Sequence, residues 1–184
     1  MIEEETSKKR KSFRETTLYN ILCDVLCVVT SVILAVMYMD NVGFIGRIPS
    51  ESMVPNYNIG DKIYVNRLSY IREEPQRGEV VVFNSWEDPE IKFIKRVVGL
   101  PGDVIDIKDG KVILNGEVLD EIYTNGSTET LENIRVVNIS YPLTIPEDYY
   151  FVMGDNRENS ADSRVYGLLK SEDIVGEASF KLKK

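Results

Sequence analysis

The sequence predicts a mostly β fold, an antiparallel β-sheet domain that follows a single N-terminal transmembrane helix. Two observations carry this prediction. One apolar run, residues 17–39, has the length of a membrane span, and the rest of the chain consists of short runs rich in Val, Ile, Phe and Tyr separated by turn signals. We therefore divide the chain into a basic tail at 1–16, an anchor at 17–39 and a β-rich domain at 40–184.

The anchor segment reads TLYNILCDVLCVVTSVILAVMYM. As a helix rising about 1.5 Å per residue, it is long enough to cross about 30 Å of hydrocarbon. Asp24 interrupts the run, and a carboxylate at the centre of a bilayer costs about 2.5 to 3.5 kcal/mol. Cys23 and Cys27, the only cysteines, lie four residues apart and suit apolar filling of one helix face better than a disulfide. A buried helix of a soluble protein is the alternative.

Basic residues precede the anchor. Five of them lie in SKKRKSFR (7–14), whereas only Arg47 follows the anchor closely. The positive-inside rule then places the N-terminus in the cytoplasm and the β-rich domain outside. Because no A-x-A cleavage signal ends the run, we expect a permanent single-pass anchor in membrane lipid.

The predicted strands share β-branched and aromatic composition; they are 61–70, 78–84, 91–99, strands within 103–119, 134–139 and 149–154. Asp109-Gly110 and Asn115-Gly116 are two-residue hairpin signals, so 103–119 is expected to run strand, turn, strand, turn. Residues 120–148 are expected to form a longer polar excursion containing one strand.

The composition excludes several kinds of chemistry. The chain has no histidine, which rules out a Ser-His mechanism and any metal site built on imidazole. The net charge of -8 argues against a nucleic-acid partner, because phosphate binding needs a concentrated basic face. Without a CxxC or Cys/His cluster, we expect no metal and no cofactor. A catalytic serine would need a lysine, a carboxylate or a terminal amine as its base.

The segment IPSESMVP (48–55) sets two serines around one glutamate. If this segment is extended, Ser50 and Ser52 project to one side and Glu51 to the other, so that the two hydroxyls share one small region. A serine-rich turn closed by Pro55 is the other interpretation.

The segment FIKRVVGLPGD (93–103) places a lysine among apolar residues. Strand alternation puts Phe93, Lys95 and Val97 on one face. Burial there would disfavour the ammonium, lower its pKa from about 10.4 and leave an amine able to act as a base. A lysine on a solvated edge strand is the alternative.

The segment MGDNRENSADSRVYG (153–167) crowds polar residues behind a hydrophobic strand. Such density is typical of a solvated loop. The same residue types can also build a rigid network, because Asp and Arg pair bidentately and serine hydroxyls can orient a lysine amine.

In this order the segments resemble the bacterial type I signal peptidases, which are membrane-anchored serine proteases with a Ser/Lys dyad. IPSESMVP is similar to the nucleophile segment of that family, IGDKIYVNRL (59–68) to the strand that follows it, FIKRVVGLPGD to the lysine segment and MGDNRENSADSRVYG to the last box. The resemblance implies a serine endopeptidase that removes signal peptides from secreted preproteins through an acyl-enzyme.

The resemblance also implies roles for single residues. Ser52 falls on the nucleophile, Lys95 on the general base, and Ser50 on the residue whose hydroxyl stabilises the oxyanion beside the Ser52 N–H. In the last box, Ser160 falls on the serine that orients the lysine amine, and Asp162 and Arg164 fall on the supporting charged pair. The positions implied to line the S1 and S3 pockets, with a preference for alanine at -1 and -3, are Ile48, Met53, Phe93 and Ile94.

Two other functions stay open. Self-cleaving repressors use a similar dyad on a related β scaffold, but they are soluble and carry a DNA-binding module where this chain has an apolar run. An anchored β domain that binds or assembles partners without catalysis is the second, although Ser52 and Lys95 are both retained. The chain departs from the family pattern at Glu51, where relatives often have a small residue, and at Asn56, where PNY replaces PTL.

Overall fold

The structure is a computed structural model, and it describes the backbone of residues 2–129, 131, 137 and 139–182. The side chains of residues 2–16, 39 and 40 also lie outside this description. The chain forms two compact units, residues 1–41 and residues 42–184.

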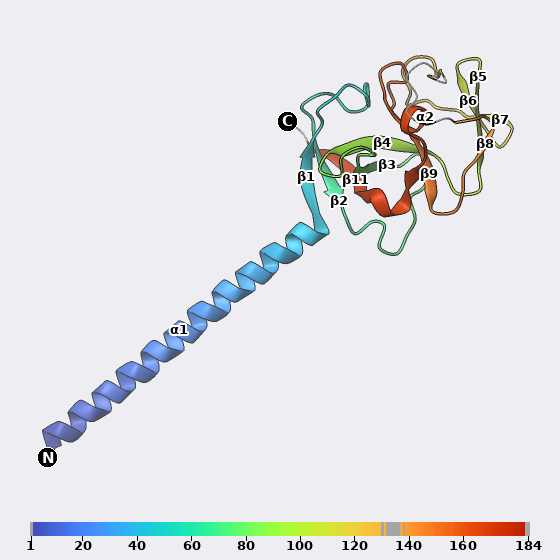
Figure 1. The fold of residues 1–184 in the computed structure, drawn as a ribbon. Coiled ribbons are helices and arrows are strands. Elements are labelled where there is room, and N and C mark those ends of the chain that lie inside the picture. Colours follow the sequence, from blue (N-terminus) through green and yellow to red (C-terminus); the bar gives the residue numbers. More distant parts are fainter. Residues whose placement is uncertain (1, 130, 132–136, 138, 183–184) are drawn as a thin grey trace. The chain divides into compact units, whose positions relative to one another are not determined.

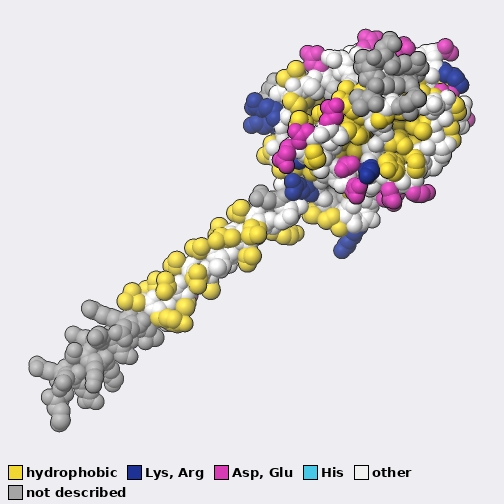
Figure 2. Space-filling view, in the orientation of Figure 1, with side chains coloured by type: hydrophobic (Ala, Val, Ile, Leu, Met, Phe, Trp, Pro, Cys, Tyr) yellow, Lys and Arg dark blue, Asp and Glu magenta, His cyan; other side chains and the backbone are white. Residues whose placement is uncertain are grey.

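Helix α1 (Ile2–Val42) accounts for the first unit. Its stretch Thr17–Tyr38, 22 residues long, is apolar enough to cross a membrane and spans about 33 Å at the α-helical rise. Apolar side chains cover the side of this stretch seen in Figure 2. None of the stretch is buried, whereas the core helix of a soluble protein would be mostly buried. The hydroxyls of Thr30 and Ser31 donate to helix carbonyls one turn earlier, which satisfies them without water.

The larger sheet of the second unit has seven antiparallel strands in the order β1-β2-β11-β3-β4-β9-β10 (Figure 1). These strands are β1 (Gly43–Arg47), β2 (Lys62–Asn66), β3 (Val80–Asn84), β4 (Lys92–Gly99), β9 (Tyr149–Met153), β10 (Leu169–Lys170) and β11 (Ile174–Leu182). Strands β3 and β4 lie in the interior of the sheet, so a side chain on either strand has neighbours from both adjacent strands.

The smaller sheet has the order β7-β6-β5-β8, and its strands lie together to one side of β3, β4 and β9 (Figure 1). They are β5 (Val104–Lys108), β6 (Lys111–Leu114), β7 (Glu117–Val118) and β8 (Leu143–Thr144). The turns at Asp109-Gly110 and Asn115-Gly116 have positive φ at both central residues, as a type I′ hairpin requires. Both predicted hairpins are therefore confirmed. Two short helices complete the unit, α2 (Ser163–Tyr166) and η2 (Ser171–Asp173).

Both faces of the central strands are buried. In β3, Val80 and Val82 enter one apolar cluster, whereas Val81 and Phe83 enter another. The first cluster also contains Ile48, Met53, Ile63, Val65, Ile94 and Ala178. The second also contains Val97, Tyr150, Val152 and Leu169. A third, between the two sheets, contains Val98, Ile105, Val112, Ile145, Phe151 and Met153. Lys95, near the middle of β4, is consequently buried, whereas Lys92 at the start of the strand is exposed.

The mostly β, antiparallel fold is as predicted, and β2 to β7 and β9 fall within the predicted runs. Strand β2 ends at Asn66, four residues before the end of the predicted run. The chain bends after Arg67, whose backbone N–H donates to the Val42 carbonyl. The strand predicted at 134–139 lies largely outside the described residues. Strands β1, β8, β10 and β11 were not predicted.

Candidate active site

The predicted nucleophile and base are in direct contact. Lys95 on β4 donates from Nζ to the Oγ of Ser52 over 2.8 Å. Both side chains are buried, with Lys95 4% and Ser52 7% exposed. The fold thus joins two residues that are 43 positions apart in the sequence.

Ser52 lies in what we call the nucleophile turn, residues 50–57, which connects β1 to β2 through bends and turns. The extended conformation considered for this segment is therefore wrong. The turn still brings the two hydroxyls together, because Ser50 Oγ lies 3.3 Å from Ser52 Oγ. Backbone hydrogen bonds from Val54 N–H to the Glu51 carbonyl, 3.1 Å, and from Tyr57 N–H to the Met53 carbonyl, 2.8 Å, close the turn.

The surroundings of Lys95 favour its neutral form. Lys95 pairs with Val81 across the sheet, and its neighbours on the same face, Phe93 and Val97, pack in the same apolar cluster. Burial lowers the pKa of Lys95 from 10.5 to about 8; the charge of Asp162 opposes this shift and that of Arg164 adds to it. The neutral amine is therefore more abundant near neutral pH than it is for an exposed lysine.

The supporting residues of the last segment form one buried network. Arg164 donates to both carboxylate oxygens of Asp162, from Nε and Nη2 at 2.9 Å each, and both residues are 0% exposed. Ser160 Oγ donates to Asp162 Oδ2 over 2.7 Å. Burial acts to raise the pKa of Asp162, but Arg164 and the hydrogen bonds from Gly154 N–H and Ser160 outweigh it, so the pKa is lowered. Asp162 therefore stays ionised.

The implied contact between Ser160 and the lysine amine is not formed in this structure. Within the described part of the chain, Ser160 Oγ donates to Asp162, and Lys95 Nζ donates to Ser52. Asp162 reaches Lys95 through its charge, which raises the lysine pKa.

Sequence reasoning missed Gly154, which allows the parts of the site to meet. A Cβ at this position would lie 2.5 Å from the Ser52 carbonyl oxygen and 2.6 Å from Ser160 Cβ, both too close for a real contact. The glycine follows β9 directly, where the GD pair of MGDN was the only available signal.

The loop after β9 also holds the nucleophile turn. Asn156 N–H donates to the Ser52 carbonyl over 3.0 Å, and its side-chain amide donates to the Glu51 carbonyl over 3.2 Å. Among the residues that the structure describes, the backbone N–H of Ser52 has no acceptor. A free N–H beside a buried serine hydroxyl is the donor that a developing oxyanion needs.

The four implied pocket residues are not all in one place. Ile48, Met53 and Ile94 lie together in the first apolar cluster, beneath the nucleophile turn. Phe93 is partly exposed and packs against the second cluster, with its ring centroid 5.7 Å from Lys95 Nζ. Because Phe93 and Ile94 are consecutive residues of β4, their side chains project to opposite faces of that strand, and the four residues do not line one shared pocket.

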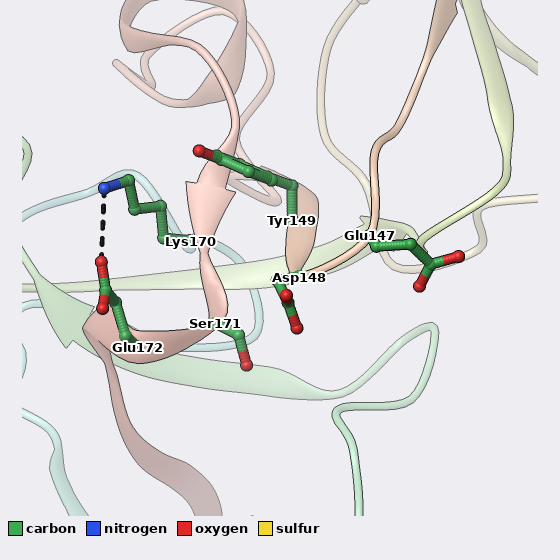
Figure 3. A pocket seen from close by; sticks show the side chains of 6 residues that line it. All are labelled: Glu147, Asp148, Tyr149, Lys170, Ser171 and Glu172. Atoms are coloured by element: carbon green, nitrogen blue, oxygen red, sulfur yellow. Dashed lines mark hydrogen bonds and ion pairs between the residues drawn. The ribbon is translucent and has the colours of Figure 1, made fainter.

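A pocket of about 480 Å³ lies elsewhere (Figure 3). It is lined by Glu147, Asp148, Tyr149, Lys170, Ser171 and Glu172. Lys170 and Glu172 pair across 3.3 Å, and none of the predicted site residues lines this pocket. It is a surface hollow separate from the dyad.

The family follows from comparison with known proteins. The model of the family described as signal peptidase, peptidase S26, matches residues 22–183. The chain belongs to this signal peptidase family. A probable signal peptidase I-2 from Synechocystis sp. is 38% identical over 182 residues, which cover 96% of this chain and 78% of that protein. A signal peptidase I from Leptolyngbya laminosa is 36% identical over 155 residues, covering 80% and 72% respectively.

Among solved structures, a signal peptidase I from Enterococcus faecalis is 31% identical and overlaps 57% of this chain and 97% of that one, with a TM-score of 0.44. The expected family is confirmed, and this signal peptidase is a hydrolase. A purely binding role does not fit that family. Helix α1 of this chain is apolar and is compatible with a membrane anchor, as expected for this family.

Proposed function

We propose that this signal peptidase cuts N-terminal signal peptides from secreted preproteins with a Ser/Lys dyad, in which Ser52 is the nucleophile and Lys95 the general base. The observation that carries the proposal is the 2.8 Å hydrogen bond between Ser52 Oγ and a buried lysine amine whose pKa is lowered to about 8. The chain has no histidine that could act instead.

The reaction has two halves. Neutral Lys95 accepts the Ser52 proton while Oγ attacks the scissile carbonyl, and the resulting ammonium returns that proton to the leaving amine. The peptide bond breaks, the mature protein leaves, and the signal peptide stays as an ester on Ser52. Lys95, neutral again, activates a water molecule that hydrolyses the ester and regenerates the serine.

The positions of Ser50 and Ser52 suit oxyanion stabilisation. The Ser50 hydroxyl, 3.3 Å from Ser52 Oγ, and the free Ser52 N–H supply two donors on the nucleophile turn. Small apolar residues, such as alanine at -1 and -3 on the signal-peptide side, are part of the proposal; Ile48, Met53 and Ile94, which pack together in the first apolar cluster, are the residues proposed to receive them.

The topology is part of the proposal. Residues 1–16 form a cytoplasmic tail, 17–39 span the membrane in contact with lipid, and 40–184 form the extracytoplasmic domain. The exposed apolar surface of α1 supports the membrane span, and the basic cluster before it supports the orientation.

Serine substitutions test the chemistry. We expect purified full-length Ser52→Ala protein in detergent to leave a preprotein uncut, whereas Ser50→Ala lowers kcat by about 10² to 10³ because it removes one oxyanion donor. Acid quenching of the wild type during turnover, followed by mass spectrometry, is expected to show a signal-peptide adduct on Ser52. Processing by Ser52→Ala at the wild-type rate, or an adduct on another residue, would refute the assignment.

A further inference from the structure

Asn56 connects the nucleophile turn to the strand that carries the lysine. We propose that Asn56 is a positioning residue that holds Ser52 at its working distance from Lys95. This inference rests on the proposed Ser52/Lys95 dyad.

The side-chain amide of Asn56 makes two contacts at once. Nδ2 donates to Asp155 Oδ2 over 2.8 Å and to the carbonyl oxygen of Tyr123 over 2.8 Å. These two bonds use both hydrogens of the amide nitrogen. The end of the nucleophile turn is therefore attached to the loop after β9 and to the polar segment that follows β7.

Asp155 connects Asn56 to Arg96 of β4. It is 0% exposed and accepts two hydrogen bonds from Arg96, from Nε at 2.7 Å and from Nη2 at 2.6 Å. Arg96 directly follows Lys95. A bidentate Arg–carboxylate pair is rigid, so the chain of contacts Asn56–Asp155–Arg96 fixes the turn relative to the lysine strand. The Arg96 guanidinium also lies 4.3 Å from the ring centroid of Tyr123. Because Asn56 donates to the Tyr123 carbonyl, both Tyr123 and Asp155 connect Asn56 to Arg96.

The nucleophile turn is thus held near both ends by one loop. At Ser52 the bond comes from Asn156 N–H, 3.0 Å, and at Asn56 it goes to Asp155. The carbonyl oxygen of Asn56 also accepts from Lys181 Nζ over 3.1 Å, so losing the side-chain attachment loosens the turn relative to β4 without releasing it. A displacement of about 1 Å between reacting groups lowers a rate by as much as about 10².

Asn56 is exposed, although its partner Asp155 is buried. Loss of its hydrogen bonds therefore has a small effect on folding, since an exposed amide regains water. A change in catalysis with little change in stability separates positioning from a merely structural role.

The test variant is Asn56→Asp, and the chain offers a matched control. Aspartate keeps the shape of asparagine, removes both N–H donors and puts a second carboxylate against Asp155. Asn115 makes a similar contact elsewhere: its Nδ2 donates to buried Asp103 over 2.8 Å, and Asp103 also accepts from the partly exposed Arg77. Asn115→Asp therefore makes the same chemical change in the hairpin between β6 and β7, away from the dyad. Asn56→Ala removes the attachment without adding charge.

The readouts are kcat, KM, the pH dependence of kcat/KM and thermal stability of the full-length protein in detergent. For Asn56→Asp and Asn56→Ala we expect kcat to fall about 10- to 100-fold with KM within about 2-fold, and the rising limb of the pH profile to move to higher pH as water reaches the amine. For Asn115→Asp we expect kcat within about 2-fold of wild type.

Wild-type kcat in both Asn56 variants, or an equal loss in Asn115→Asp, would overturn the positioning role. If kcat/KM of the wild type did not rise with pH, Lys95 would be refuted as the base. The kcat values of the Asn56 variants would still decide whether Asn56 holds the turn.

Discussion

Lys95→Met is expected to lower kcat by at least about 10⁴ and, at the same time, to stabilise the folded protein at pH 7. The loss of rate follows because, among the described residues, Lys95 is the base in contact with Ser52 Oγ, and removal of a member of such a catalytic set costs about 10⁴ or more. Methionine fills the same apolar site between Val81, Phe93 and Val97 without an amine that has to be kept out of water.

The gain in stability has a defined pH range. The pKa of Lys95 is about 8 in the folded state and 10.5 when unperturbed, so the unfolded chain binds more protons between these values. Stability of the wild type therefore rises as the pH increases from about 8 to about 10.5, and below pH 8 the full cost of about 3 kcal/mol is present. Denaturant unfolding should show Lys95→Met more stable by about 1 to 3 kcal/mol at pH 7, with the gain shrinking toward pH 10.5. A variant less stable than wild type at pH 7 would contradict a lysine whose charged form is destabilised by burial.

Asp162→Asn is expected to destabilise the domain by about 3 to 5 kcal/mol, because it leaves Arg164 as a buried charge without its partner. The pKa of Asp162 is lowered in the folded state, so its contribution is present above the unfolded value of 3.8 and is lost as the pH falls below it. The exposed pair Lys170–Glu172 provides the control, since Glu172→Gln should change stability by less than about 1 kcal/mol.

Urea unfolding at pH 7 measures both changes. Equal, small losses in Asp162→Asn and Glu172→Gln would show that the buried pair does not hold the last segment. We expect activity of Asp162→Asn to fall as well, because Ser160 and Gly154 both donate to this carboxylate beside the nucleophile turn.

Much of the site could be predicted because its signals are local. Phe93 and Val97 flank Lys95 at strand spacing, and this pattern made a lysine among apolar side chains one of two interpretations, the other being a solvated edge strand. The two-residue turns at Asp109-Gly110 and Asn115-Gly116 were equally local, because their left-handed backbone selects few residue types.

The rest depends on contacts between distant segments. No periodicity could show that the nucleophile turn meets β4, and the extended conformation considered for it was wrong although the two hydroxyls do meet. Strands β8 and β10 have two residues each, too few to show alternation, and β11 is paired irregularly with both neighbours. Gly154 and Asn56 matter through atoms supplied by Ser52, Ser160 and Asp155, which sequence position alone does not bring together.

The pH dependence of kcat/KM for cleavage of one preprotein is the most direct test of the neutral lysine. A single buried amine with a pKa of about 8 predicts a rise of tenfold per pH unit below that value and a plateau above it. The limb reports the free enzyme, in which Lys95 donates to Ser52. A profile that is flat from about pH 6 to 9, or that keeps rising to the ordinary lysine pKa of 10.5, would contradict the account.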